Sequence, residues 1–268
     1  LGDGIDPGAD YWLCADPVNV EVGMDSLAIA DRATLAIDRA EADAIVATLA
    51  AHFRDIGLQW HAPASTRWYI GQRAAPAITT TPLAQARTLP FAAALPQGAD
   101  GAQWRSIVNE MQMLLHEHPV NLAREARGAS TINAVWIADG SRAPSSTLVA
   151  RQGPATWFCA TPLARGFALA AGQPVRAVPF DLAAWATTQS TEPLTPISVV
   201  VLEDAVPLES LERAWFAPLV TALRAGTIGM LTLVATSATA ALTCEVTKRD
   251  LGYFWRRPRP FQSYVIEH

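Results

Sequence analysis

An amphipathic helical pattern that runs into a proline and then into an apolar strand constrains the fold of this chain more than any other feature. Between Ala102 and Glu117 the apolar residues recur at the spacing of one helix face. Pro119 ends or re-caps that helix, because proline lacks the N–H that a helix interior needs. The segment from Ile132 to Gly140 reads as a buried strand. A helix is therefore expected to pack on a sheet through a stripe of Trp104, Ile107, Val108, Met111, Leu114 and Leu115.

The rest of the first half favours an α+β module. Asp38 to Phe53 has helical periodicity, and Gly57 is placed to end that helix. Tyr11 to Val22 alternates as a strand does, with a break expected at Pro17. The remaining expectations are a strand or turn at Leu27–Leu35, short strands at Leu58–Trp60 and Arg67–Ile70, a turn or helix entry at Thr79–Pro82 and a loop at Pro90–Gly101.

The second half has a different pattern, in which strands alternate with helices. A linker rich in Pro, Ser and Gly is expected at Ala143–Gly153, so the chain is divided near residue 150. Alternation with short connections predicts a mainly parallel sheet covered on both faces. The expected strands are Thr156–Cys159, Val175–Val178, Ile197–Leu202, Ile228–Ala235 and Leu242–Val246, and the expected helices are Leu163–Ala171, Leu182–Thr188 and Leu208–Ala225, the first and last closed by Gly172 and Gly226.

The charge of the chain argues against two classes of partner. Its 268 residues carry a formal net charge of -5, whereas proteins that bind nucleic acid usually present a basic face. The same charge argues against binding to an anionic membrane surface. No run of about eighteen apolar residues is present, so no segment is expected to span a membrane. Half of the residues are hydrophobic and 17% are charged, which is enough to build a large core.

The three cysteines indicate a reducing compartment. Cys14, Cys159 and Cys244 are odd in number and far apart, and they fit neither a zinc pattern nor a disulfide framework. A cytoplasmic location is therefore expected, and no signal peptide is recognised. The chain begins with Leu1 instead of Met, so we expect it to be a fragment that lacks an N-terminal piece.

Four polar side chains just after the long helix form the candidate ligand site. Arg124 and Arg127 stand three residues apart, on one face if the segment is helical. Arginine side chains match phosphate or carboxylate oxygens bidentately. Together with His118 and Asn121, this pair could hold a small phosphorylated acid or another anion. The alternative is a solvated helix face on which the arginines pair with Glu117 or Glu125.

Metal binding and catalysis are not expected from these residues. His116 and His118 point to different faces of a continuing helix, and no third or fourth ligand is evident beside them. No phosphate-binding loop, dinucleotide fingerprint, nucleophile elbow or zinc-protease motif is present. After His118 the next histidine is His268, at the other end of the chain. We therefore expect no metal, no cofactor and no catalytic residue.

The same segments carry a resemblance to a known family. His118-Pro-Val-Asn-Leu-Ala-Arg-Glu-Ala-Arg-Gly128 and Asn133-Ala-Val-Trp-Ile-Ala-Asp-Gly140 resemble cofactor-independent phosphoglycerate mutases of the archaeal type. The likeness covers roughly residues 10 to 140. It extends to Asp10–Val20, Thr80-Thr-Pro82 and Leu95-Pro-x-Gly98, which occur in the family's order.

A bacterial branch of that lineage, the RpfE-type regulatory proteins, is similar over nearly the full chain. The additional matching pieces are Tyr11-Trp-Leu13, Ala15-Asp-Pro17, Arg67-Trp-Tyr69, Asn109-Glu-x-Gln-Met-Leu-Leu-His116 and Trp255-Arg-Arg-Pro258. The resemblance implies an α/β fold in two parts. Residues 1–145 form an α+β module like the mutase middle domain, and residues 150–268 form a partial, mainly parallel sheet like that of alkaline phosphatase.

The resemblance also implies what this chain has lost. The mutases use a nucleophilic Ser and two metal ions held by Asp and His. Residues 151–268 offer Asp181, Glu203, Asp204 and Asp250 without a His partner, and Cys14 stands where the mutases place an Arg. The expectation is a degenerate, non-catalytic protein that is regulatory or binds a small phosphorylated ligand. Two alternatives remain open, an active metal-dependent mutase or related phosphoryl transferase and a pure protein-interaction module. The oligomeric state is left open.

Overall fold

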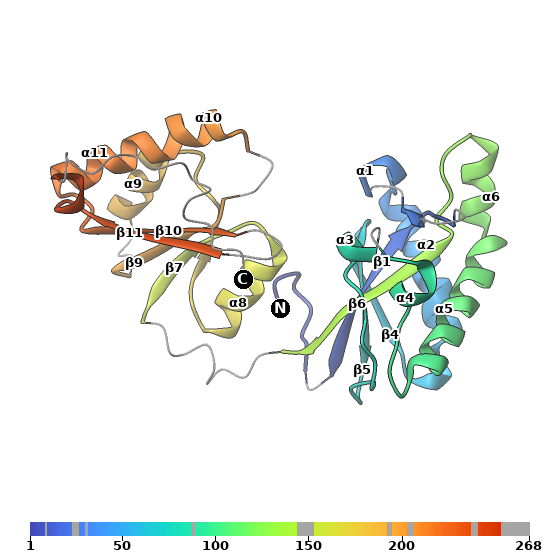
Figure 1. Ribbon diagram of the computed structural model, residues 1–268. Helices are drawn as coiled ribbons and strands as arrows, with labels where there is room; N and C mark the ends of the chain where they lie inside the picture. The colour runs from blue at the N-terminus through green and yellow to red at the C-terminus, as the bar shows by residue number, and fades with distance from the viewer. Residues whose placement is uncertain are drawn as a thin grey trace. The chain divides into compact units, whose positions relative to one another are not determined.

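The computed structural model divides the chain into two compact units, which are described separately (Figure 1). The first contains Leu1–Arg151 and Leu169–Ala171, and the second contains the remainder. The structure describes residues 1–8, 10–22, 27–29, 32–86, 89–143, 153–191, 195–202, 206–236 and 241–252. Most of the predicted linker at 143–153 therefore lies outside the described residues, and so does Trp255-Arg-Arg-Pro258, one of the pieces that carry the family resemblance.

The first unit is built on a four-stranded antiparallel sheet. In spatial order its strands are β4 (Gln59–Ala64), β5 (Arg67–Gln72), β1 (Tyr11–Val18) and β6 (Ala134–Arg142). The sequence predicts all four, although β4 and β5 extend further than their aromatic residues indicated. β1 and β6 connect residues more than a hundred positions apart, and β6 carries the segment that follows the polar motif.

Two long helices cover one face of this sheet. α2 (Arg39–His52) packs on β4, and α5 (Gly101–His116) packs on β6. Both agree with the predicted helices to within one residue at each end. Asp38 caps the N-terminus of α2 in a capping box with Glu41, and Gly57 ends the short 3-10 turn that follows in a left-handed conformation.

The core of the first unit lies between these helices and the sheet. Alternate strand residues face the helices, as the twofold period of a strand requires. The helix stripe predicted from the sequence is confirmed, because Trp104, Ile107, Met111 and Leu115 are buried in this core. Its remaining buried members are Leu13, Ala15, Leu35, Ile37, Ala42, Ile45, Val46, Leu49, Phe53, Leu58, Trp60, Trp68, Ile70, Ile132, Val135 and Ile137.

A second, smaller cluster covers the other face of β6. Ala134, Trp136 and Ala138 alternate with the core residues of that strand and pack against two short helices. These helices are α3 (Leu83–Ala86) and α4 (Phe91–Ala94). The expected loop at Pro90–Gly101 is therefore wrong over α4, whose four residues are too few for sequence periodicity to reveal.

The break predicted at Pro17 is also displaced. β1 continues through Pro17, which pairs with Val135 of β6, and the next strand begins at Val20. β5 pairs with β1 only as far as Cys14, so Pro17 has a strand on one side alone. A proline without an N–H is tolerated at such an edge. The end of the expected strand Tyr11–Val22 forms β2 (Val20–Val22). The expected strand or turn at Leu27–Leu35 forms β3 (Leu27–Ile29) and a helical turn, α1 (Arg32–Leu35).

The second unit contains the predicted parallel sheet. β7 (Ala155–Phe158) lies between β8 (Val175–Arg176) and β9 (Ile197–Val200), and both pairings are parallel. α8 (Pro162–Ala170) and α9 (Leu182–Thr191) provide the connections. Contrary to the sequence prediction, β9 is not deeply buried, since Ile197 is 49% exposed.

The last part of the second unit departs from the parallel pattern. The predicted long helix forms as α10 (Leu208–Leu211), a π-helical segment (Glu212–Phe216) and α11 (Ala217–Ala225), closed by Gly226. β10 (Met230–Thr236) and β11 (Ala241–Thr247) then pair with each other as an antiparallel hairpin. They were expected in the parallel sheet, but the connection between them is too short for the crossover that parallel pairing needs. Among the described residues, no helix has both the length and the apolar character needed to cross a membrane.

Candidate functional site

The polar motif forms a short helix beside the long ones. α6 (Pro119–Ala126) starts with Pro119 at its first position, where the missing N–H costs nothing. His118 is the N-cap, and its Nδ1 accepts a hydrogen bond from the Val120 N–H at 3.2 Å. Pro119 therefore re-caps the chain after α5, which is one of the two outcomes that the sequence allowed.

His118 is buried against α2. Its Nε2 lies 3.0 Å from Thr48 Oγ1. Burial lowers the pKa of His118 below its ordinary value, and a hydrogen bond to the backbone of Ala44 opposes this only in part. The imidazole is therefore neutral near pH 7, with Nδ1 used as a cap and Nε2 turned to a neighbouring helix.

Asn121 uses its whole amide group inside the protein. Its Nδ2 donates to the carbonyls of Leu115 at 2.7 Å and Ile132 at 2.8 Å. Its Oδ1 accepts from the Ile132 N–H at 2.8 Å. The side chain thus links the last turn of α5 to Ile132, two residues before β6 begins.

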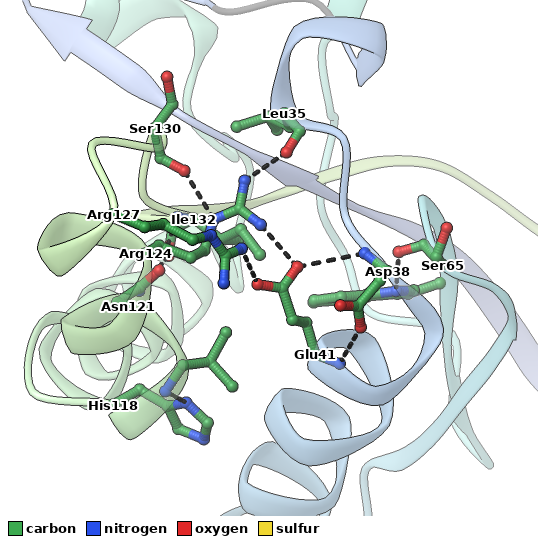
Figure 2. A network of polar contacts seen from close by, with 12 residues as sticks. Leu35, Asp38, Glu41, Ser65, His118, Asn121, Arg124, Arg127, Ser130 and Ile132 are labelled. Carbon is green, nitrogen blue, oxygen red and sulfur yellow. Dashed lines mark hydrogen bonds and ion pairs between the residues drawn. The ribbon is translucent and has the colours of Figure 1, made fainter.

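Arg124 is almost completely buried, with 1% of its side chain exposed. Its Nε donates to the Ser130 carbonyl at 2.7 Å, and Nη1 donates to Glu41 Oε2 at 2.6 Å. Nη2 donates to the Leu35 carbonyl. The guanidinium therefore joins α6, the loop before β6 and the first turn of α2, as Figure 2 shows.

Arg127 reaches the other oxygen of the same carboxylate. It pairs with Glu41 Oε1, while 52% of its side chain remains exposed. Glu41 itself is only 9% exposed and also accepts from the Asp38 N–H at 3.1 Å. One buried carboxylate therefore faces two guanidinium groups, of which one is buried and the other is open to solvent (Figure 2).

The structure thus places all four predicted residues at one corner of the first unit, but it gives them internal partners. Glu41 is the central member that the sequence reasoning missed. The alternative pairing of the arginines with Glu117 or Glu125 is not what is seen, because Arg124 and Arg127 both form ion pairs with Glu41. A signal was available, since Asp38 and Glu41 have the spacing of a capping box at the start of an apolar helix.

Metal ligands do not converge in the part of the chain that the structure describes. No three His, Cys, Asp or Glu side chains come together there as a metal site needs. The donor set among these residues therefore does not fit the two-metal centre that the mutase resemblance implies. None of the three cysteines forms a disulfide, and Cys14 is half-buried, Cys159 buried and Cys244 exposed.

An open depression adjoins the motif on the α5 side. Its volume is about 460 Å³, and its lining includes His116 and Glu117 from the end of α5 and Asn133, the residue just before β6. Gln112 and Met113 complete it. Asn133 is bonded to the backbone of Val20 through both its oxygen and its nitrogen, so its amide is fixed.

The chain is similar to solved structures at low sequence identity. A cofactor-independent phosphoglycerate mutase from Thermoplasma acidophilum matches 92% of this chain and 69% of its own length, with 15% identity and a TM-score of 0.45. The PH0037 protein from Pyrococcus horikoshii matches 74% of this chain and 48% of its own length, with 16% identity and a TM-score of 0.41. No model of a known protein family matches the chain, and no curated protein matches it in sequence.

Proposed function

We propose that this chain is a non-catalytic phosphoglycerate-mutase-like protein, of the RpfE-type regulatory branch, that binds a small phosphorylated acid. The mutase-like part of the proposal rests on the His-Pro-Val-Asn and Arg motifs of residues 118–128 and on the Asn-containing strand that follows. Among the four predicted site residues, Arg127 is the one whose side chain contacts the ligand.

The main support for ligand binding is that Arg124 and Arg127 form ion pairs with the same carboxylate, that of Glu41. Arg124 and Arg127 bring two positive charges to one carboxylate, so these three side chains together have an excess of one positive charge. Only Arg127 is accessible, with 52% of its side chain exposed. A phosphate monoester carries roughly −1.5 to −2 charges near pH 7 and accepts bidentate hydrogen bonds from arginine. It can therefore compete with Glu41 for Arg127 while Arg124 keeps the carboxylate in place.

The fixed contacts of the other three residues support a non-catalytic role. His118 would need a free ring nitrogen to move a proton, but both nitrogens lie against protein groups. The amide of Asn121 and the guanidinium of Arg124 are likewise bonded to the backbone and to Glu41. These groups hold helices together, and a substrate could reach them only by breaking that arrangement.

Calorimetric titration of the chain with 3-phosphoglycerate tests the binding part. Arg127→Ala should weaken binding by about 10- to 100-fold, as expected for loss of a charged hydrogen bond. Arg39→Ala is the matched control, because Arg39 is also a half-exposed arginine paired with a carboxylate, that of Asp43, at 2.6 Å. Equal affinities of the two variants would contradict the placement of the ligand at Arg127.

A mutase assay in the presence of Mn²⁺ or Zn²⁺ tests the non-catalytic part separately. We expect no conversion of 3-phosphoglycerate to 2-phosphoglycerate. Turnover that depends on the added metal would favour the alternative of an active mutase or phosphoryl transferase, even if the binding result stood.

A further inference from the structure

A second carboxylate-binding arrangement lies on the sheet of the first unit, away from Arg127 in sequence. Arg67 and Tyr69 are two residues apart on β5, so their side chains leave the same face of the sheet. Both donate to Asp3: Arg67 Nη2 to Oδ1 at 2.6 Å, Arg67 Nε to Oδ2 at 2.8 Å, and the Tyr69 hydroxyl to Oδ2 at 2.9 Å. Three donors therefore converge on one carboxylate.

This face is the one opposite the α2 and α5 layer. Trp68 and Ile70, the neighbours of Tyr69 along β5, are buried in the core beneath those helices. Tyr69 is paired in register with His61 of β4 on one side and with Cys14 of β1 on the other. The Arg67–Tyr69 pair thus lies in a row of polar side chains contributed by three adjacent strands.

The N-terminal segment holds this face at a second point. The Trp12 indole N–H donates to the Pro7 carbonyl at 2.9 Å. The Trp12 ring lies over Gly71, where an added Cβ would approach it to 3.2 Å, and it contacts His61 at a centroid distance of 5.2 Å. Residues 1–7 contain no helix or strand, so side-chain contacts such as these attach the segment to the sheet.

The electrostatics of the cluster agree with a site for an anion. Burial tends to raise the pKa of Asp3, but hydrogen bonds from Arg67 and Tyr69 and the charge of Arg67 bring that pKa below its ordinary value. Burial and the nearby Asp3 carboxylate raise the pKa of Tyr69, so its hydroxyl remains a donor. The side chain of Asp3 is 11% exposed and that of Arg67 is 33% exposed, so solvent reaches the pair from the arginine side.

We propose that Arg67 and Tyr69 form an anion-binding site that Asp3 occupies from within the chain, and that a small carboxylate or phosphate ligand replaces Asp3 there. The forked guanidinium and the hydroxyl bind two oxygens of one anionic group, which is the arrangement that recognises a free carboxylate or phosphate. Asp3 comes from a segment of turns between Leu1 and Pro7, so its release breaks no helix or strand. Ligand binding would free this segment from the face.

Titration of the chain and of Asp3→Asn with inorganic phosphate tests the proposal. Asp3→Asn removes the competing charge and should bind phosphate about tenfold or more tightly than the wild type, the scale of one charged hydrogen bond. Asp6→Asn is the matched control, because the Asp6 carboxylate belongs to the same segment but accepts from the Gly8 N–H, whereas Arg67 donates to Asp3. Equal affinities of wild type, Asp3→Asn and Asp6→Asn would overturn the proposal.

The assignment to Arg67 and Tyr69 is tested in the Asp3→Asn background. Adding Arg67→Ala should abolish the gain in phosphate affinity, and adding Tyr69→Phe should reduce it. Retention of the gain in the Asp3→Asn/Arg67→Ala double variant would overturn the site. Circular dichroism melting of each variant separates loss of binding from loss of the fold.

The reactivity of the Cys14 thiol reports on release of the segment. Cys14 is half-buried beside Tyr69, while Cys244 is exposed and Cys159 buried as internal references. Alkylation of the Cys14 peptide by iodoacetamide, relative to that of the Cys244 peptide, should increase in Asp3→Asn and in wild type with phosphate. Unchanged Cys14 labelling in both would contradict displacement of Asp3.

The site at Arg67 and Tyr69 is independent of the proposed ligand site at Arg127. Arg127→Ala in the Asp3→Asn background should leave the gain in phosphate affinity intact, because Arg127 belongs to a different cluster of contacts. Failure of the Arg127 prediction together with success of the Arg67 prediction would leave the site at Asp3 as the anion site of the first unit.

Discussion

Glu41 and Arg124 form a buried ion pair, 2.6 Å long, between residues 83 positions apart in the chain. Glu41 stands in the first turn of α2, where a carboxylate is favoured by the helix dipole, and Arg124 stands in α6. Both side chains are at least nine-tenths buried. The pair connects α2 to α6 through polar side chains inside the first unit.

Arg124→Ala should strongly destabilise the first unit. It leaves Glu41 buried with only Arg127 as a cationic partner, and it removes the donors to the Ser130 and Leu35 carbonyls. Removing one partner of a buried ion pair typically costs about 3–5 kcal/mol. The free energy of unfolding from urea titration, followed by tryptophan fluorescence, measures the loss.

Arg127→Ala should cost less than about 1 kcal/mol in the same measurement, because a half-exposed ion pair is screened by solvent. This contrast separates a structural arginine from an accessible one. Equal losses for the two variants would mean that the stability depends on the number of positive charges near Glu41 and not on the buried contacts of Arg124.

Asn121→Ala should also lower the free energy of unfolding of the first unit. The substitution leaves the Leu115 carbonyl and both backbone groups of Ile132 without the partners that the amide supplies. Each buried polar group left unpaired costs about 1–3 kcal/mol. Asn109→Ala on the exposed face of α5 is the control and should change the unfolding free energy by less than about 0.5 kcal/mol. A small loss at Asn121 would show that water replaces the amide.

The long elements of the first unit were predictable because their signals are local. The stripe from Trp104 to Leu115 and the Asp38 cap each lie within one helix, so periodicity and capping chemistry reveal them. α4 is only one turn long and gives no such pattern. The course of β1 through Pro17 depends on where β5 stops, which is a property of the sheet and not of the β1 sequence.

The candidate site was predictable in its members but not in their partners. The motif puts His118, Asn121, Arg124 and Arg127 close together along the chain, and the structure places them at one corner. The partner Glu41 and the acceptor Leu35 lie 83 and 89 positions before Arg124 in the chain. Nothing in the spacing of α6 specifies which distant carboxylate completes the charge balance.

The stability of the chain should fall as pH decreases, and His118 should account for part of the fall. Burial lowers the pKa of His118 in the folded state below the ordinary value of 6.5. The unfolded state therefore binds the proton more readily, so this contribution is present above pH 6.5 and is lost as the pH falls below it. Urea unfolding of wild type and His118→Gln between pH about 7.5 and pH about 5 should give a shallower dependence for the variant. The exposed His116→Gln is the control, and an equal change in its slope would remove the assignment to His118.

Trp60 and Trp68 should respond differently to replacement by phenylalanine. Trp68 donates its indole N–H to the Ser65 carbonyl at 3.0 Å, so Trp68→Phe loses a buried hydrogen bond worth about 1 kcal/mol in addition to packing. The indole nitrogen of Trp60 is buried without a hydrogen-bond partner among the described residues. Trp60→Phe removes that unsatisfied donor and should lower the thermal midpoint less than Trp68→Phe. The reverse order would indicate that ordered water satisfies Trp60.

Gly98→Ala should be among the most damaging single-methyl additions to the first unit. Gly98 has a φ of +104°, and an added Cβ would lie 2.5 Å from the Ala77 carbonyl oxygen. That conformation alone costs a residue other than glycine about 1–3 kcal/mol. The clash also disturbs the bridge between Thr79 and Gln97, which fixes the loop before α5. Gly153→Ala, where a Cβ meets open space, should leave the thermal midpoint nearly unchanged. If both variants melted at the wild-type temperature, the loop at Gly98 would have to adopt another backbone path without loss of stability.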